Sequence, residues 1–353
     1  MEAISTAIVR HLSLILGTSL LAFSISLIAA PFFIKALKRF QFGQSIRETT
    51  VDGKEATIFN QLHKKKEGTP SMGGVLIWLT VVITSLISLA FPVAEFTNFS
   101  LINRAETYLP MFTLITCGVL GLVDDVFNVK KIGSHKGLSA ITKMTWLTLL
   151  ALLGGLWFHF RLGYTEINLG ILGGNLEIGW LYIPLFIFVI ISSANAVNIT
   201  DGLDGLAGGL VILAFTVLGI VAYTEGLTIL AAFCATIVGA SVGFLWFNVP
   251  PAAFFMGDTG SLALGATIGV IAMMIDHILL IPFITFIFII ETLSVIIQLL
   301  SKKFRGKKIF HIAPIHHHFE YIGWPEFRVT MRFWILGCGF ASLGLIFYLA
   351  KLI

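Results

Sequence analysis

The stretch DGLAGGLVILAFTVLGIVAYTEGLTILAAFCATIVGASVGFLWF, residues 204–247, decides the fold. It holds two apolar runs, 204–223 and 228–247, separated by a short break that contains Glu225. Each run has the length of roughly 20 residues that a helix needs to cross the hydrocarbon core of a bilayer. The stretch therefore predicts two successive membrane-spanning helices.

The composition extends this prediction to the whole chain. Of the 353 residues, 57% are hydrophobic and only 12% are charged, and the mean hydropathy is +0.93. These values exclude a soluble globular protein. We expect an all-α integral membrane protein, residues 1–353 forming a single polytopic domain with about ten transmembrane helices. The predicted spans are 12–34, 72–91, 108–123, 138–158, 181–198, 204–223, 228–247, 260–275, 278–300 and 332–350.

The basic residues predict the orientation. Lys35, Lys38 and Arg39 follow the first apolar run, so this run is a retained helix whose N-terminus lies outside, not a cleaved signal peptide. With strict alternation, one side of the membrane carries 19 of the 23 Lys and Arg residues. The positive-inside rule makes this side cytoplasmic and both termini extracytoplasmic. The predicted cytoplasmic loops are 35–71, 124–143, 199–203, 248–259 and 301–332.

One short segment predicts β-structure. Residues 166–179 (EINLGILGGNLEIG) alternate apolar and polar residues around Gly173-Gly174-Asn175. This pattern indicates a β-hairpin. The topology places it on the extracytoplasmic side.

Four polar clusters stand out, and the predicted topology brings all four to the cytoplasmic face. They are Asp124-Asp125, Asn195–Asp204 (NAVNITDGLD), Met256–Asp258 (MGD) and His316-His317-His318. Each has a plain structural explanation: a solvated helix end, helix caps in the turn that contains Asp201 and Asp204, an N-cap at Asp258, and a surface histidine tract. Together they indicate one site. Its carboxylates and amides suit Mg²⁺ bound through one or two carboxylates plus substrate phosphates, whereas a histidine run alone does not indicate Zn²⁺.

Two features are weaker. Glu291, with Ser294 and Gln298 on the same helix face, is an intramembrane charge and so a functional candidate, although an interhelical hydrogen bond explains it equally well. The segment Lys64–Gly74 leads lysines into a helix start, where they could contact phosphate. We find no nucleic-acid-binding motif, so no nucleic-acid partner is expected.

The chain resembles the polyprenyl-phosphate N-acetylhexosamine-1-phosphate transferases nearly from end to end. The APIHHHFE segment favours the branch that uses a muramoyl-pentapeptide donor over siblings that transfer N-acetylglucosamine phosphate. The motifs that carry the resemblance are KKEGTPSMGG (65–74), GLVDD (121–125), NAVNITDGLDGLAGG (195–209), FLWFN (244–248), FMGDTGSLALG (255–265), ETLSVIIQ (291–298) and APIHHHFEYIGWPEFRVTMRFW (313–334).

The resemblance implies a reaction and its partners. Phospho-MurNAc-pentapeptide would pass from UDP-MurNAc-pentapeptide to undecaprenyl phosphate, giving lipid I and UMP for peptidoglycan synthesis. The reaction would need Mg²⁺ and take place at the cytoplasmic face of the bacterial inner membrane, among membrane lipids. A homodimer is also in keeping with the family.

The resemblance further implies roles for the polar residues. Asp258 would be the metal ligand and, with Asp124, Asp125 and His317, catalytic; Asp124 and Asp125 would lie near the lipid phosphate. The implied substrate-binding residues are Asp201 and Asp204 at the nucleotide and metal, Asn248 and Phe255 at the uridine, and His316 and His318 at the phosphates or sugar-peptide. Asn195 and Asn198 are further substrate-binding candidates.

The sequence departs from the family pattern at one position. Asn128 stands where many members have a lysine, three residues after the acidic pair. The phosphate contact of that lysine cannot be carried over. Lys130, Lys131 or Lys136 could replace it, and we take Lys136 as a substrate-binding candidate.

Two alternatives stay open at this point. The lipid phosphate could attack the donor directly or through a covalent aspartyl intermediate. In another functional class, a cation-coupled transporter would also have intramembrane carboxylates. It predicts charges near the bilayer midplane, whereas here the charges gather at the cytoplasmic ends and only Glu291 lies deep.

Overall fold

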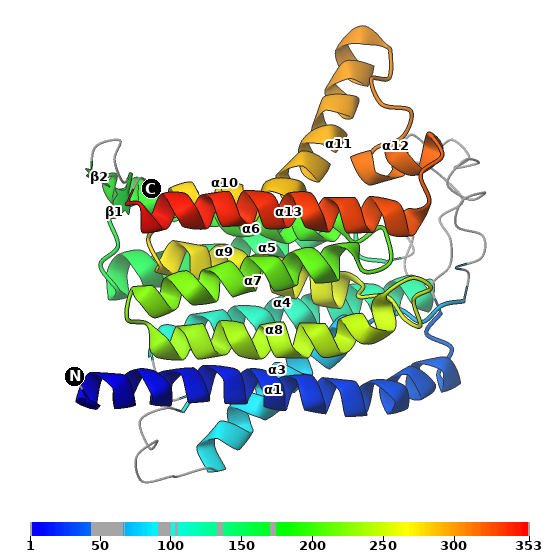
Figure 1. The fold of residues 1–353 in the computed structure, drawn as a ribbon. Helices are drawn as coiled ribbons and strands as arrows, with labels where there is room; N and C mark the ends of the chain where they lie inside the picture. The colour runs from blue at the N-terminus through cyan, green and yellow to red at the C-terminus, as the bar shows by residue number, and fades with distance from the viewer. Residues whose placement is uncertain are drawn as a thin grey trace.

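The computed structural model describes residues 2–43, 66, 68–90, 100–102, 105–132, 137–169 and 174–351. Most of its helices run side by side in one bundle (Figure 1). The helices are α1 (Glu2–Arg39), α3 (Gly74–Ala90), α4 (Ala105–Val129), α5 (Ala140–Leu156), α6 (Tyr182–Thr200), α7 (Leu206–Thr224), α8 (Thr228–Asn248), α9 (Asp258–Met274), α10 (Ile281–Ile284), α11 (Phe286–Arg305), α12 (Ile315–Tyr321) and α13 (Glu326–Leu349).

The all-helical membrane class is confirmed. Within the described ranges, seven helices are long and apolar enough to cross a membrane, and eight if α10 and α11 form one broken span. The helices α3 and α9 are apolar but shorter, and they fall at two further predicted spans. The count of ten crossings and the sidedness of the termini stay predictions.

The helix α9 forms the axis of the bundle. Every residue from Thr259 to Met273 is buried, and α9 packs against α4 and α6 most extensively and also against α3 and α7. Its glycines, alanines and serines let neighbouring backbones approach closely, as is usual between membrane helices. A Cβ on Gly121 of α4 would lie 2.2 Å from the carbonyl oxygen of Asp258. The first residue of α9, Asp258, is thereby fixed among several helices.

The structure corrects the predicted spans and loops at several places, of which three matter here. The helix α4 continues past residue 123 to Val129, because Asp124 and Asp125 find hydrogen-bond donors on neighbouring segments and need not end the helix. The predicted loop 301–332 contains the short helix α12, on which Ile315 and Phe319 pack against the core. The span 278–300 is bent by 79° between α10 and α11, a break that hydropathy does not register because both sides are apolar.

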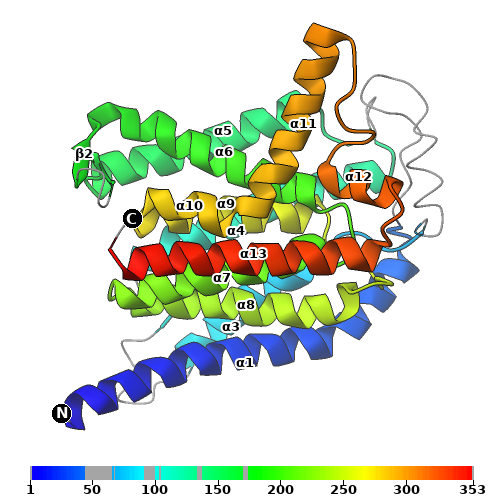
Figure 2. The same cartoon turned by 45° about the horizontal axis from the view of Figure 1, so that its top comes forward.

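The two ends of the bundle differ. The predicted hairpin is confirmed: β1 (Glu166–Asn168) pairs antiparallel with β2 (Asn175–Glu177). It lies at the same end of the bundle as the N- and C-termini, whereas α12 lies at the opposite end (Figure 1). The helix α11 projects away from the bundle toward the side of α12 (Figure 2). The start of α9 and the turn between α6 and α7 belong to the α12 end.

Candidate active site

An ammonium group lies between two carboxylates at the start of α9. Lys143 Nζ is 2.9 Å from Asp258 Oδ2 and 3.0 Å from Asp124 Oδ2. The three side chains come from α5, α9 and α4 respectively. Asp124 also accepts the backbone N–H of Leu138 at 2.6 Å. These contacts join the first and third sequence clusters through a residue that neither cluster contains.

The second oxygen of Asp258 is held by α6. Asn198 Nδ2 donates to Asp258 Oδ1 at 2.8 Å and to Ser261 Oγ at 2.9 Å. The spacing of Asn198 in the NAVNITDGLD segment thus serves to orient a carboxylate on another helix. Asp258 is anchored through both oxygens.

Asp125 binds the start of α9. Its two oxygens accept the backbone N–H groups of Asp258 at 3.2 Å and Thr259 at 3.1 Å. A carboxylate at this position satisfies free N–H groups and complements the positive end of the helix dipole. Gly257, with φ of 76°, must be glycine here, because a Cβ would lie 2.6 Å from Asp125 Oδ2. Asp125 therefore positions the backbone of Asp258 at the start of α9.

Asp201 connects this region to the turn between α6 and α7. Its Oδ2 accepts the backbone N–H of Gly257 at 3.1 Å. Burial raises the pKa of Asp201 to about 7, and the negative charges of Asp258 and Asp204 act in the same direction, against the opposing N–H of Gly257. This carboxyl group titrates near neutral pH.

A second cluster of charged side chains lies around Asp204, in the turn between α6 and α7. Lys66 Nζ is 2.6 Å from Asp204 Oδ1 and also pairs with Glu326 on α13. Although burial alone would lower it, these two carboxylates raise the pKa of Lys66 above its usual value. The ammonium lies 5.7 Å from the centre of the Phe255 ring. Asp204, Glu326, the Lys66 ammonium and the Phe255 ring thus form one cluster.

Asn248 binds two backbone segments next to this cluster. It is only 4% exposed; its Oδ1 accepts the N–H of Gly205 at 3.0 Å and its Nδ2 donates to the carbonyl of Phe254 at 2.9 Å. Both polar atoms of the Asn248 side chain thus have hydrogen-bond partners within the protein. Asn248 therefore helps to fix the segment that carries Phe255 beside the Asp204 turn.

His316 is buried against the same turn. Its Nδ1 lies 2.9 Å from Glu291 Oε2, and both side chains have no exposed surface. Its Nε2 has no hydrogen-bond partner among the residues that the structure describes, and it would be 2.3 Å from a Cβ on Gly202. The structure thus pairs His316 with the intramembrane Glu291 and presses it onto the Asp201–Gly202 backbone.

The other two histidines of the triplet have separate surroundings. His317 Nδ1 lies 2.7 Å from Glu320 Oε2 on the same short helix. His318 Nδ1 accepts the backbone N–H of His311 at 3.3 Å, and the two rings stack. The three adjacent histidines therefore point to three different partners.

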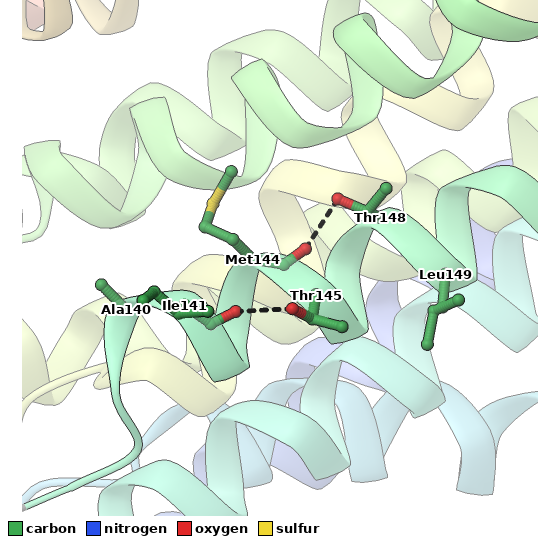
Figure 3. Close-up of a pocket in the computed structure, with 6 residues that line it drawn as sticks. All are labelled: Ala140, Ile141, Met144, Thr145, Thr148 and Leu149. Carbon is green, nitrogen blue, oxygen red and sulfur yellow. Dashed lines mark hydrogen bonds between the residues drawn. The ribbon is translucent and has the colours of Figure 1, made fainter.

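A groove of about 470 Å³ runs along α5 (Figure 3). Its Thr145 and Thr148 hydroxyls donate to carbonyls of their own helix, at 2.9 Å and 2.7 Å, so the groove is largely apolar. Asn195, predicted to bind substrate, contacts Met144 Sδ at 3.6 Å beside this groove and does not reach Asp258. The lining residues are Ala140, Ile141, Met144, Thr145, Thr148 and Leu149.

Sequence reasoning missed Lys143 and Glu326. Lys143 lies where the predicted loop 124–143 and the predicted span 138–158 overlap, so it was counted only as a basic residue of the cytoplasmic side. In the structure its ammonium contacts Asp124, near the lysine-to-asparagine departure at Asn128. Glu326 carried no functional signal, because it begins a helix where an acidic residue is ordinary. Lys136 lies outside the described residues.

The donor set at Asp258 suits Mg²⁺. Asp258 and Asp124 present carboxylate oxygens on either side of the Lys143 ammonium, where positive charge is already favoured. In the part of the chain that the structure describes, no three His, Cys, Asp or Glu side chains form a ready cage. Mg²⁺ usually takes one or two carboxylates and completes its shell with phosphate oxygens and water.

Comparison with known proteins identifies related sequences. Residues 108–276 match the sequence model of Glycosyl transferase family 4, and residues 66–77 match signature 1 of the phospho-N-acetylmuramoyl-pentapeptide-transferases. That signature begins at Lys66.

Similar proteins carry the same description over nearly their whole length. A phospho-N-acetylmuramoyl-pentapeptide-transferase of Geobacillus sp. (strain WCH70) is 42% identical over 328 residues, which are 92% of this chain and 95% of that protein. The protein of the same description from Bacillus subtilis (strain 168) is 39% identical over 331 residues, 94% of this chain and 97% of that protein. The chain belongs to the phospho-N-acetylmuramoyl-pentapeptide-transferase family.

Proposed function

We propose that the protein transfers phospho-MurNAc-pentapeptide from UDP-MurNAc-pentapeptide to undecaprenyl phosphate, forming lipid I and UMP. The observation that carries this proposal is the Lys143 ammonium, which contacts both Asp124 and Asp258. A second ammonium, that of Lys66, is bound to Asp204 in the turn between α6 and α7. Phosphoryl transfer asks a protein mainly to position reactants and to neutralise charge. A site in which two lysine ammonium groups each contact two carboxylates is suited to that task.

The nucleotide end of the donor fits the cluster around Asp204. The Phe255 ring offers a face for stacking a planar base. The edge of uracil alternates carbonyl oxygens with an N–H, so it needs both donors and acceptors. Lys66 supplies the donor and Asp204 the acceptor, 2.6 Å apart.

The lipid acceptor fits the other side of the site. The apolar groove on α5 runs from Ala140 to Leu149 and passes the helix turn that carries Lys143. In this arrangement an isoprenoid chain lies in the groove and its phosphate meets Lys143 and Asp124. The lipid is thereby aligned with the Asp258 region.

Mg²⁺ belongs to the proposal. Asp258, with Asp124, would hold the ion, which would neutralise the diphosphate charge. Asn198 and Asp125 keep Asp258 oriented through its carboxylate and its backbone N–H. The site would lie at the cytoplasmic face, and a homodimer is part of the same family-based proposal.

The chemical step is an in-line displacement. An oxygen of the lipid phosphate forms a bond to the phosphorus that carries the sugar, and the bond from that phosphorus to the bridging oxygen breaks, so UMP leaves with the electron pair. A phosphate monoester with a second pKa of about 6 is largely dianionic at neutral pH, so Asp124 orients it or removes a residual proton. Isolation of phosphosugar-labelled protein without any lipid acceptor would instead establish the covalent route.

Two donors tested side by side separate this function from its sibling. Purified protein with undecaprenyl phosphate should release UMP from UDP-MurNAc-pentapeptide and not from UDP-N-acetylglucosamine. The reverse preference would assign the chain to the sibling reaction. A transporter predicts substrate accumulation in sealed vesicles without UMP release, and this outcome would overturn the proposal.

A further inference from the structure

The first turns of α13 bind the backbone of Asp204 on both sides. Glu326 Oε1 accepts the N–H of Asp204 at 2.7 Å, and Thr330 Oγ1 donates to the Asp204 carbonyl at 3.2 Å. Glu326 and Thr330 are four residues apart and so share one face of the helix. The peptide groups on either side of a single residue are therefore fixed by one rigid element.

The same carboxylate also fixes Lys66. Glu326 accepts the Lys66 ammonium, which is bonded to Asp204 Oδ1 as well. The Lys66 and Glu326 side chains are each 21% exposed, so this contact is partly shielded from water. Glu326 thus ties the segment before α3 to the turn between α6 and α7.

The contact face continues along α13 into the bundle. Trp334 Nε1 donates to the carbonyl of Leu206 at 3.4 Å, and the Trp334 ring fills the space beside Gly209, where a Cβ would lie 2.1 Å from the ring. This packing anchors the helix next to the start of α7. A motion of Asp204 would have to move α13 or break these bonds.

We propose that Glu326 and Thr330 are positioning residues, which hold Asp204 and Lys66 in the arrangement that receives the nucleotide end of the donor substrate. This inference rests on the proposed function. It assigns to α13 a role in donor affinity and none in the acceptor lipid, whose groove lies on α5. Glu326 accepts both hydrogen bonds, from the Asp204 N–H and from the Lys66 ammonium, through the same oxygen Oε1. A glutamine at this position keeps that acceptor oxygen but loses the negative charge that pairs with Lys66.

The test compares steady-state constants for the donor and the acceptor in Glu326→Ala, Glu326→Gln and Thr330→Val. In Glu326→Ala we expect the donor KM to rise about tenfold, the scale of one lost hydrogen bond to a charged group. The acceptor KM and kcat should stay within about threefold. Glu326→Gln keeps an oxygen for the Asp204 N–H and should recover most of the donor affinity. Thr330→Val should raise the donor KM about threefold.

Glu225→Ala is the matched control. Glu225 Oε1 accepts the hydroxyl of Tyr348 at the other end of α13, at 2.7 Å, so this variant also loses a carboxylate contact to α13 but far from the site. Its donor KM should equal that of the wild type. If Glu326→Ala does not fold, Glu326→Gln and Thr330→Val still carry the test.

The outcomes distinguish this inference from the proposed function. Wild-type protein that releases no UMP from the donor would refute the proposed function itself. An active wild type with an unchanged donor KM in Glu326→Ala and Thr330→Val would overturn the positioning role. Equal losses in Glu326→Gln and Glu326→Ala would overturn the backbone clamp in favour of charge alone.

Discussion

Lys143 and Asp258 form an ion pair in which the ammonium nitrogen lies 2.9 Å from one carboxylate oxygen. The same ammonium contacts Asp124 at 3.0 Å. Two carboxylates this close repel each other unless positive charge lies between them. Lys143 therefore determines how strongly the site attracts a further cation.

Replacing Lys143 with methionine should reduce UMP release at least about 100-fold, the scale of losing a group that stabilises transition-state charge. The same change should lower the Mg²⁺ concentration at which the melting temperature rises, because the two carboxylates lose a competing cation. Lys351→Met, an exposed lysine at the far end of α13, is the control. Unchanged turnover in Lys143→Met would remove Lys143 from the mechanism.

Asp125 should behave as a support and not as a reacting group. Asp125→Asn keeps one acceptor oxygen but loses the second bond and the charge at the start of α9, so we expect unfolding to become easier by about 1–3 kcal/mol. Activity should fall in parallel with stability and recover at lower temperature. Full inactivation of a well-folded Asp125→Asn protein at every temperature would instead show direct participation.

The pH dependence of stability should identify Asp201. Its pKa of about 7 in the folded protein exceeds the value of about 4 for an exposed aspartate. Between these values only the folded protein holds the proton, so stability is greatest below this window and falls as the pH rises through it.

Asp201→Asn lacks this titration. Its melting temperature in EDTA, relative to that of the wild type, should therefore increase from pH 5 to pH 8. A difference that stays constant across this range would contradict the raised pKa.

Gly202 should not accept a side chain. In Gly202→Ala the new Cβ would be 2.3 Å from His316 Nε2, and the fully buried His316 cannot move without leaving Glu291. We expect a loss of about 1–3 kcal/mol, as for other overpacked sites, together with reduced turnover. Gly339→Ala on α13, where a Cβ has no neighbour within 4 Å, should be close to neutral. Equal melting temperatures for the two variants would refute this contact.

Much of the fold could be predicted because membrane helices follow from apolar length alone. The spans 204–223 and 228–247 match α7 and α8 within two residues. The end of α4 could not be predicted, because Asp125 is satisfied by N–H groups of α9, more than a hundred residues later. The bend between α10 and α11 could not be predicted either, since apolar residues continue through it.

The sequence predicted several residues of the site but not which residues contact one another. The motifs named Asp124, Asp258 and Asn198, and these side chains do meet. Partners such as Lys143 and Glu326 come from helices whose neighbours only the tertiary structure defines. For the same reason the histidine triplet suggested one shared role, whereas His316 is paired with Glu291 inside the bundle.

The most direct measurement is UMP release by purified protein from UDP-MurNAc-pentapeptide and undecaprenyl phosphate, with and without Mg²⁺, in the wild type and in Asp258→Ala. The proposed function predicts release that requires both substrates and the metal and that disappears in Asp258→Ala. Well-folded wild-type protein that releases no UMP from this donor, or an Asp258→Ala variant that still responds to Mg²⁺, would contradict it.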